Sequence, residues 1–193
     1  TLSSRGYRQA PLENPPPIYL GALRPKMIEM AAEHGDGVIF NLWPKSALPK
    51  MMEHVAIGAE RAGKKAEDVE IVNRAMVLAT DDKEAGRNLF RAAFAPYYAT
   101  PVYNKFLAWA GYGDAAETIT EGWAAKDRAK TSGALTDEMI DEIAIIGTED
   151  EIRDRIREDA AGGVHTSIIA PLGINPDDAQ RTFDAFRADV FQF

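Results

Sequence analysis

The sequence predicts an α/β fold built on a parallel β-sheet. Short apolar segments alternate with amphipathic segments of helical period along most of the chain. Turns rich in Gly, Pro and Asp separate them. The 193 residues, 46% hydrophobic and 27% charged, are enough for one domain with a substantial core. Parallel strands joined by helices form doubly wound open sheets or barrels, with right-handed crossovers.

The first strand–helix unit contains the most informative turn. An apolar strand at about 18–22 runs into Gly21-Ala22, where small side chains let another group approach the backbone. Pro25 then begins a helix at about 25–34, because its fixed φ suits the first helical position. Free N–H groups at such a helix start form a natural anion site. The turn is therefore either a site for a phosphate-bearing cofactor or an ordinary turn with nothing bound.

Two further units follow the first. The pattern predicts a strand at about 37–41 with a helix at about 46–62, then a strand at about 69–79 with a helix at about 82–95. The third strand is mostly apolar, as expected for a strand buried on both faces. Arg74 lies inside it and predicts a buried charge with a partner. A structural ion pair is favoured over a contact to a ligand.

An aromatic segment at about 96–145 interrupts this rhythm. It is interpreted as a lid or subunit contact, or alternatively as a small helical core of its own. A helix then opens at Thr148, with Glu151 completing a capping box. A fourth strand at about 164–172 and a last helix from Asn175 complete four strand–helix units.

The overall composition excludes several classes of function. Net charge is −8 with a pI of about 5.0, which argues against nucleic acid as a partner. No apolar stretch is long enough to span a bilayer, and no secretory signal is visible. Cysteine is absent and no two of the three histidines are spaced i, i+4, so no metal site is predicted. These features are compatible with a cytoplasmic protein.

Several segments together resemble the luciferase-like monooxygenase family. The resemblance begins with residues 16–27 and 31–38. Residues 39–44, Ile-Phe-Asn-Leu-Trp-Pro, are similar to the family's deazaflavin-dependent branch, which uses coenzyme F420. Residues 146–152 and 161–165 resemble the family's last helix–strand unit, although a capped helix is a less specific pattern.

The resemblance implies a (β/α)8 TIM barrel of which this chain is the C-terminal half, strands five to eight. Residues 1–17, polar and Pro-rich, are then a linker from a missing N-terminal half. Residues 18–193 hold the four strand–helix units, with the helical insertion at about 96–145. A half-barrel leaves open sheet edges and an uncovered apolar face. Such a chain is expected to bind its missing half or to self-associate, and a homodimer is expected.

Carried over residue by residue, the resemblance assigns the first turn to the cofactor. Gly21, Ala22, Leu23 and Arg24 occupy the family turn that contacts the phosphate-bearing tail through backbone N–H groups, and Pro25 starts the helix behind it. Arg24 departs from the common pattern, in which many members have Gly. An arginine there could pair bidentately with a phosphate or block the approach to the backbone. As a solvated side chain it would be disfavoured by the helix dipole.

The loop after the second strand supplies a candidate substrate pocket of Asn41, Trp43 and Lys45, because barrel active sites lie at the C-terminal ends of the strands. Asn41 could hydrogen-bond a ligand, Trp43 could stack on a ring, and Lys45 could attract an anion. The alternatives are a helix-entry Asn, a buried loop Trp and a surface Lys. His165 lies at the start of a strand, away from the usual active site, and no catalytic residue is predicted.

The leading hypothesis is an F420 (deazaflavin)-dependent oxidoreductase that transfers hydride between the cofactor and a small organic substrate. An FMN-dependent monooxygenase is the first alternative, since flavin mononucleotide also permits oxygen activation. A non-catalytic half-barrel is the second. A doubly wound domain for another phosphorylated ligand is disfavoured, because no G-x-G-x-x-G turn is present.

Overall fold

The computed structural model describes residues 13–173 and 175–192. Most of the expected linker, residues 1–12, lies outside this described part. Residues 13–18 are exposed and form no helix or strand, so the regular structure begins at Tyr19.

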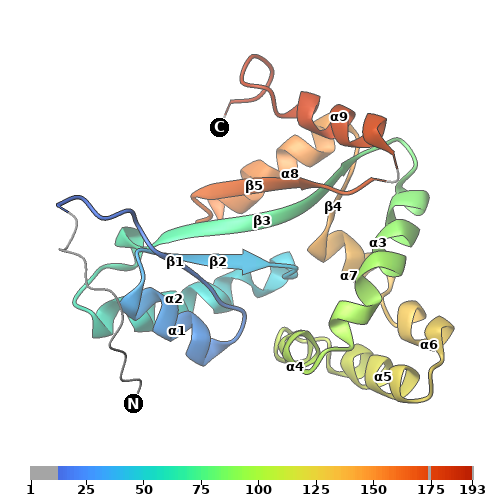
Figure 1. Ribbon diagram of the computed structural model, residues 1–193, viewed down its shortest axis with the longest axis horizontal. Helices are drawn as coiled ribbons and strands as arrows, with labels where there is room; N and C mark the ends of the chain where they lie inside the picture. Colours follow the sequence, from blue (N-terminus) through green and yellow to red (C-terminus); the bar gives the residue numbers. More distant parts are fainter. Residues whose placement is uncertain (1–12, 174, 193) are drawn as a thin grey trace, which may run out of the picture.

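The described residues form one sheet of five parallel strands (Figure 1). The strands are β1 (Tyr19–Gly21), β2 (Gly37–Asn41), β3 (Glu70–Ala79), β4 (Ile145–Gly147) and β5 (Thr166–Pro171). The long strand β3 lies at the centre, because it pairs with β2, β4 and β5. All pairings are parallel, which confirms the predicted sheet type.

The expectation of only four strands is wrong. Ile145–Gly147 forms the additional strand β4, which pairs with the last three residues of β3. Three residues are too few to show either alternation or a continuous apolar run. The preceding apolar residues also belong to a helix that ends at Ile143, so the sequence pattern merges the two elements.

The helices agree closely with the predicted order. The regular units contain α1 (Pro25–His34), α2 (Leu48–Arg61), α3 (Lys83–Tyr98), α8 (Glu149–Ala161) and α9 (Pro176–Ala185), with 3-10 turns η1 (Lys45–Ala47) and η2 (Ala66–Asp68). The segment expected at 96–145 contains α4 (Pro101–Trp109), α5 (Gly113–Ala124), α6 (Arg128–Gly133) and α7 (Asp137–Ile143). The predicted helix at 25–34 and strand at 37–41 are confirmed with the same limits. The capping box of α8, Thr148 with Glu151, is also confirmed.

One face of the sheet is covered by helices along its whole length. Helices α1 and α2 pack against Val38, Phe40 and Ile71. Further along β3, α8 and α9 pack against Ala75 and Val77. Side chains alternate across a strand, so Ile71, Ala75 and Val77 all point to this same helix-covered face.

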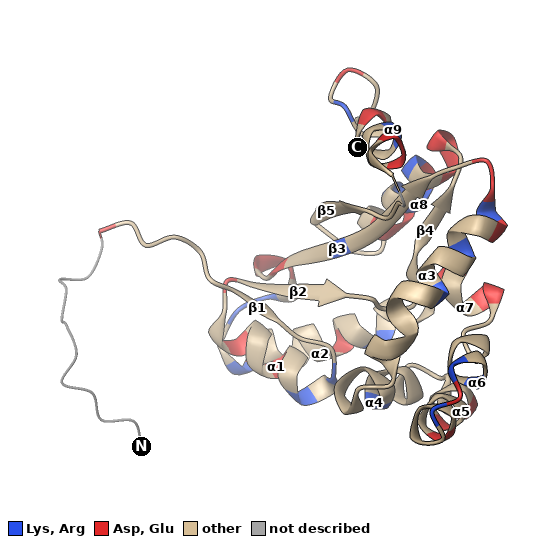
Figure 2. Ribbon diagram, turned by 45° about the vertical axis from the view of Figure 1, so that its right-hand side comes forward, with Lys and Arg blue, Asp and Glu red and all other residues tan. Residues whose placement is uncertain are grey.

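The opposite face is only partly covered. Helix α3 and the insertion helices α4–α7 pack over its C-terminal end, where Met76 and Leu78 join their core. Before that point the face carries Ile39, Asn41, Arg74 and Ile168, and we call this part the open face. Arg74 is exposed and Ile168 is 47% exposed. Figure 2 shows that Lys, Arg, Asp and Glu residues lie mainly on helices and loops, whereas Arg74 lies within strand β3.

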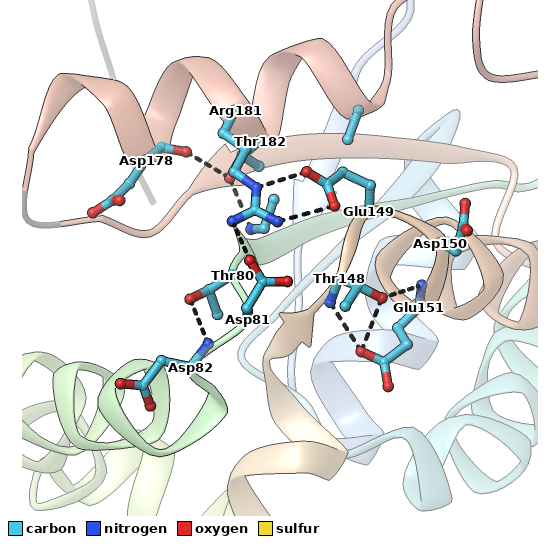
Figure 3. Close-up of polar contacts among 12 residues, drawn as sticks. Thr80, Asp81, Asp82, Thr148, Glu149, Asp150, Glu151, Asp178, Arg181 and Thr182 are labelled. Carbon is cyan, nitrogen blue, oxygen red and sulfur yellow. Dashed lines mark hydrogen bonds and ion pairs between the residues drawn. The ribbon is translucent and has the colours of Figure 1, made fainter.

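Arg181 ties helix α9 to the C-terminal ends of β3 and β4 (Figure 3). Its Nε and Nη2 donate to the two oxygens of Glu149 at 2.6 and 3.1 Å, and Nη1 donates to Asp81 at 3.1 Å. The hydrogen bonds from Arg181 lower the pKa of Glu149 to about 2. Thr182 completes the contact, because its Oγ1 accepts from the N–H of Ala79 at 3.0 Å. These contacts hold helix α9 against the C-terminal end of the sheet, on its helix-covered face.

Candidate active site at the C-terminal edge of the sheet

The candidate loops lie at one end of the sheet. Strands β1 and β2 pair in parallel, and the loops at 22–24 and 42–44 therefore follow neighbouring strand ends. Figure 1 shows β2, β3 and β5 pointing toward the side where α3–α7 lie. The two loops therefore lie at the same end of the sheet.

The turn after β1 leaves room for another molecule at Gly21. This residue is exposed, and a Cβ added to it would meet no atom within 4 Å. Ala22 is different, because it is buried and its N–H donates to the carbonyl of Ile39 at 3.1 Å. The backbone N–H of Ala22 is thus used by the sheet. The N–H groups of Leu23 and Arg24 have no hydrogen-bond partner among the described residues.

The start of helix α1 favours an anion. Arg24 is the N-cap in extended conformation without a side-chain cap, and Pro25 occupies the first turn. The first turn contains no acidic residue, so nothing in it offsets the positive end of the helix dipole. The Arg24 side chain is exposed and has no partner in the described part of the chain. Lys26 instead pairs with Glu29 at 2.9 Å. Free N–H groups and a free guanidinium are suited to a phosphate.

Asn41 and Arg74 lie side by side on the open face. They are register partners on β2 and β3, and Arg74 Nη1 donates to Asn41 Oδ1 at 3.4 Å. The expectation of a buried Arg74 in a structural ion pair is wrong, since the residue is exposed and has no carboxylate partner among the described residues. The reason is that no helix among the described residues covers the open face at this position.

Tyr103 extends this polar row from the insertion. Its hydroxyl oxygen accepts a hydrogen bond from Asn41 Nδ2 at 2.9 Å. The Asn41 amide is therefore held between Arg74 and Tyr103, with its oxygen toward Arg74 and its nitrogen toward Tyr103. The Tyr103 hydroxyl donates to no acceptor among the described residues, so its proton is available to a ligand. Sequence reasoning missed this residue, because only the packing of α4 brings it to the end of β2.

Leu42 separates the two sides of the loop after β2. Its φ of +52° is a rare conformation for a bulky residue, and it is held by Tyr98, whose hydroxyl donates to the Leu42 carbonyl at 3.0 Å. Tyr98 is fully buried, and this burial raises the pKa of its hydroxyl well above 10. The turn at Leu42 directs Asn41 toward the open face and Trp43 toward the core.

The structure does not bring Trp43 and Lys45 together with Asn41. Trp43 is only 3% exposed, and its Nε1 donates to Asn73 Oδ1 on the helix-covered face at 2.9 Å. Lys45 is exposed and donates to Glu158 of α8 at 3.4 Å, on the same side. Of the three predicted pocket residues, Asn41 alone faces the open face.

The polar groups at the N-terminal end of the open face already have hydrogen-bond partners within the chain. Glu70 accepts hydrogen bonds from Thr166 at 2.7 Å and from Tyr19 at 2.5 Å, and these lower its pKa. Nearby, His165 exchanges hydrogen bonds with the backbone of Ile71 through its own N–H and its Nδ1. The site that offers unsatisfied groups is thus at the C-terminal edge.

No cluster of three or more His, Asp or Glu side chains suited to a metal ion occurs within residues 13–173 and 175–192. None of the helices in this part of the chain is long and apolar enough to cross a membrane.

Comparison with known protein families matches residues 2–166 to the luciferase-like monooxygenases. The chain belongs to this family. A 5,10-methylenetetrahydromethanopterin reductase of Archaeoglobus fulgidus is 32% identical over 165 residues, which cover 83% of this chain and 49% of that protein. A reductase of the same name from Methanolobus tindarius is 32% identical over 167 residues, covering 84% and 51%. The chain spans about half the length of the curated relatives it matches.

Solved structures of two other proteins share the fold. The coenzyme F420-dependent tetrahydromethanopterin reductase from Methanopyrus kandleri superposes with a TM-score of 0.68 at 22% identity, over 88% of this chain and 49% of that chain. An F420-dependent secondary alcohol dehydrogenase in complex with an F420–acetone adduct gives 0.67 at 15% identity, over 93% and 50%. These likenesses show the α/β fold with a parallel sheet that this luciferase-like family has.

Proposed function

We propose that this chain is part of an F420-dependent oxidoreductase that transfers hydride between the deazaflavin and a small organic substrate. The observation that carries the proposal is the 32% identity to a 5,10-methylenetetrahydromethanopterin reductase over 83% of this chain, and the tetrahydromethanopterin reductase that shares its fold is described as coenzyme F420-dependent. The cofactor supplies the hydride chemistry, and the protein positions it and shapes the pocket.

The β1–α1 turn is suited to the phosphate-bearing tail of this cofactor. Gly21 is open to an approaching group, and the backbone N–H groups of Leu23, Arg24 and Lys26 have no partner among the described residues. The Arg24 guanidinium adds a positive charge at the same place. Ala22 and Pro25 shape the turn but offer no free N–H, because that of Ala22 is bonded and Pro25 has none.

The open face is suited to the ring and the substrate. Asn41 and Tyr103 present polar groups beside apolar Ile39 and Ile168. We assign β1, β2, β3 and β5 to strands five to eight of a TIM barrel, with β4 as an addition beside β3. Sequence corresponding to the other half of the relatives would then close the barrel around the open face and leave its C-terminal mouth to the ring. If the chain is such a half-barrel, we expect it to form a homodimer when it is isolated.

An FMN-dependent monooxygenase is the second candidate, because a long-chain alkane monooxygenase superposes with a TM-score of 0.53. A non-catalytic half-barrel is the third. Equilibrium titration of the natural polypeptide with F420 and, separately, with flavin mononucleotide discriminates among them. Binding of F420 with a lower dissociation constant supports the proposal. A lower dissociation constant for flavin mononucleotide favours the monooxygenase, and binding of neither favours the non-catalytic half-barrel.

An Arg24→Ala variant tests the turn within the same titration. It should weaken binding of the phosphate-bearing cofactor by roughly tenfold or more, since it removes a charge-assisted contact. Arg128→Ala is the matched control, because Arg128 is another exposed arginine whose side chain has no partner among the described residues, and it lies on α6. Equal effects of the two substitutions would contradict the role of Arg24.

A further inference from the structure

Arg74 keeps one edge of its guanidinium free. Both of its hydrogen bonds use Nη1, which donates to Asn41 Oδ1 at 3.4 Å and to Met76 Sδ at 3.2 Å. Neither acceptor is charged, and both contacts are long or involve sulfur. Its Nε and Nη2 have no partner among the described residues. These two nitrogens form the edge that can bind a planar anion bidentately.

Other arginines of the same molecule use that edge for carboxylates. Arg87 binds Asp141 through Nε at 2.9 Å and Nη2 at 2.6 Å. Arg181 binds Glu149 in the same way, at 2.6 and 3.1 Å. Arg74 thus leaves free, on the surface of the sheet, the same guanidinium edge that binds a carboxylate in Arg87 and Arg181.

The surroundings of Arg74 fit a flat ring better than a protein partner. It is the middle residue of a row across three strands, with Asn41 on one side and Ile168 on the other. The row below contains apolar Ile39 and Val72. Val72 is only 2% exposed, so a ring would rest on the half-buried Ile39 and the exposed Ile168, with one edge at Arg74.

The distance to the turn after β1 also fits. Gly21 pairs with Ile39, which pairs with Val72, so Gly21 lies two strands away from β3 and one row below Arg74. Two inter-strand spacings amount to roughly 10 Å. That separation suits a cofactor whose ring and phosphate are joined by a short polyol chain, with the phosphate at the turn.

We propose that the Nε–Nη2 edge of Arg74 binds the anionic N1–C2 carbonyl edge of the reduced cofactor ring, and that Asn41 holds the guanidinium in position. This inference rests on the proposed function. A hydride added to the oxidised deazaflavin would bring an electron pair with it, so the reduced ring would carry more negative charge at that edge than the oxidised ring. Arg74 therefore stabilises the reduced form more than the oxidised form and raises the reduction potential of the bound cofactor.

The test compares dissociation constants for oxidised and reduced F420 in the natural polypeptide under anaerobic conditions. The variants are Arg74→Gln, Arg74→Lys and, as control, Arg128→Gln. Arg74→Gln should weaken binding of the reduced form about tenfold and of the oxidised form far less. For a two-electron couple a tenfold change corresponds to about 30 mV, so the potential should fall by that amount. Arg74→Lys should lie between the wild type and Arg74→Gln, and Arg128→Gln should change neither constant.

Two results would overturn the role of Arg74. Equal weakening of both redox forms would assign it to general binding, and a loss of thermal stability with an unchanged ratio of the two dissociation constants would assign it to a structural role in the sheet. The same titrations with oxidised and reduced flavin mononucleotide separate this inference from the proposed function. If the wild type binds only the flavin, the choice of F420 fails, while a selective loss of reduced flavin in Arg74→Gln still supports Arg74. If neither cofactor binds, both proposals fail.

Discussion

Trp43 Nε1 donates a hydrogen bond to Asn73 Oδ1 at 2.9 Å, and this bond fixes the loop after β2 to the interior of β3. Asn73 Nδ2 in turn donates to Asp159 at 3.3 Å, and Asp159 accepts from Arg155 at 3.1 Å. Burial raises the pKa of Asp159 even though Arg155 opposes the shift. The chain of contacts joins the candidate-site loop to α8.

Replacing Asn73 should therefore destabilise the fold. Asn73→Ala leaves the buried indole N–H of Trp43 without its acceptor, which costs about 1–3 kcal/mol of unfolding free energy. Urea denaturation measures the change. Asn88→Ala on the exposed side of α3 is the control and should stay within about 0.5 kcal/mol of the wild type. An equally small effect at Asn73 would show that the bond contributes nothing to stability.

A Gly58→Ala variant tests the close packing of α2 against α1. A Cβ at this position would lie 2.1 Å from the carbonyl oxygen of Glu29 and 2.8 Å from Cβ of Ala32, so Gly58→Ala should force the helices apart and cost about 1–3 kcal/mol. Gly133 is the matched control in α6, because an added Cβ there would meet nothing within 4 Å. Gly133→Ala should be neutral or stabilising by up to about 1 kcal/mol. Equal melting temperatures for the two variants would contradict the packing described here.

A Tyr98→Phe variant tests whether the hydrogen bond from Tyr98 stabilises the loop after β2. Tyr98→Phe removes the hydrogen bond to the Leu42 carbonyl and should lower the unfolding free energy by about 0.5–1.5 kcal/mol. Tyr97→Phe is the control, because the Tyr97 ring is half-exposed and its hydroxyl has no partner among the described residues. Thermal denaturation of both variants distinguishes them, and a larger loss in Tyr97→Phe would refute the role given to Tyr98.

The buried carboxylate of Glu29 predicts a loss of stability in acid. Hydrogen bonds from Lys26, Arg61 and His54 lower its pKa from 4.5 to about 2. Because the folded-state pKa lies below the unfolded value, the stabilisation is complete above about pH 4.5. It is lost as the pH falls from there toward about 2.

Denaturant unfolding at several pH values between 7 and 2.5 measures this dependence. The wild type should lose stability steeply below about pH 4.5. Glu29→Gln should be less stable at pH 7 and should show a shallower decline, since it has no proton to bind. Parallel curves for the two proteins would mean that another group controls the acid transition.

The regular units could be predicted because each carries its own local signal. Pro25 fixes the start of α1 and the pair Thr148–Glu151 fixes the start of α8, and both appear where the sequence places them. The strand β4 is different, because three residues give no period. Its position depends on the pairing with β3.

The residues of the candidate site were harder to predict from the sequence than the fold. Asn41 and the β1–α1 turn follow from the rule that barrel sites lie at the C-terminal ends of strands. Which side of the sheet a side chain faces depends on tertiary packing. The positive φ of Leu42 sends Trp43 into the core, and the packing of α4 brings Tyr103 to Asn41. The exposure of Arg74 likewise depends on which helices cover β3.

A crystal structure of the natural polypeptide with bound F420 tests the central claim most directly. The account predicts the phosphate of the cofactor at the N–H groups of Leu23, Arg24 and Lys26, with the ring on the open face over the row of Asn41, Arg74 and Ile168. Electron density for the phosphate at any other loop, or for the ring on the helix-covered side of the sheet, would contradict it.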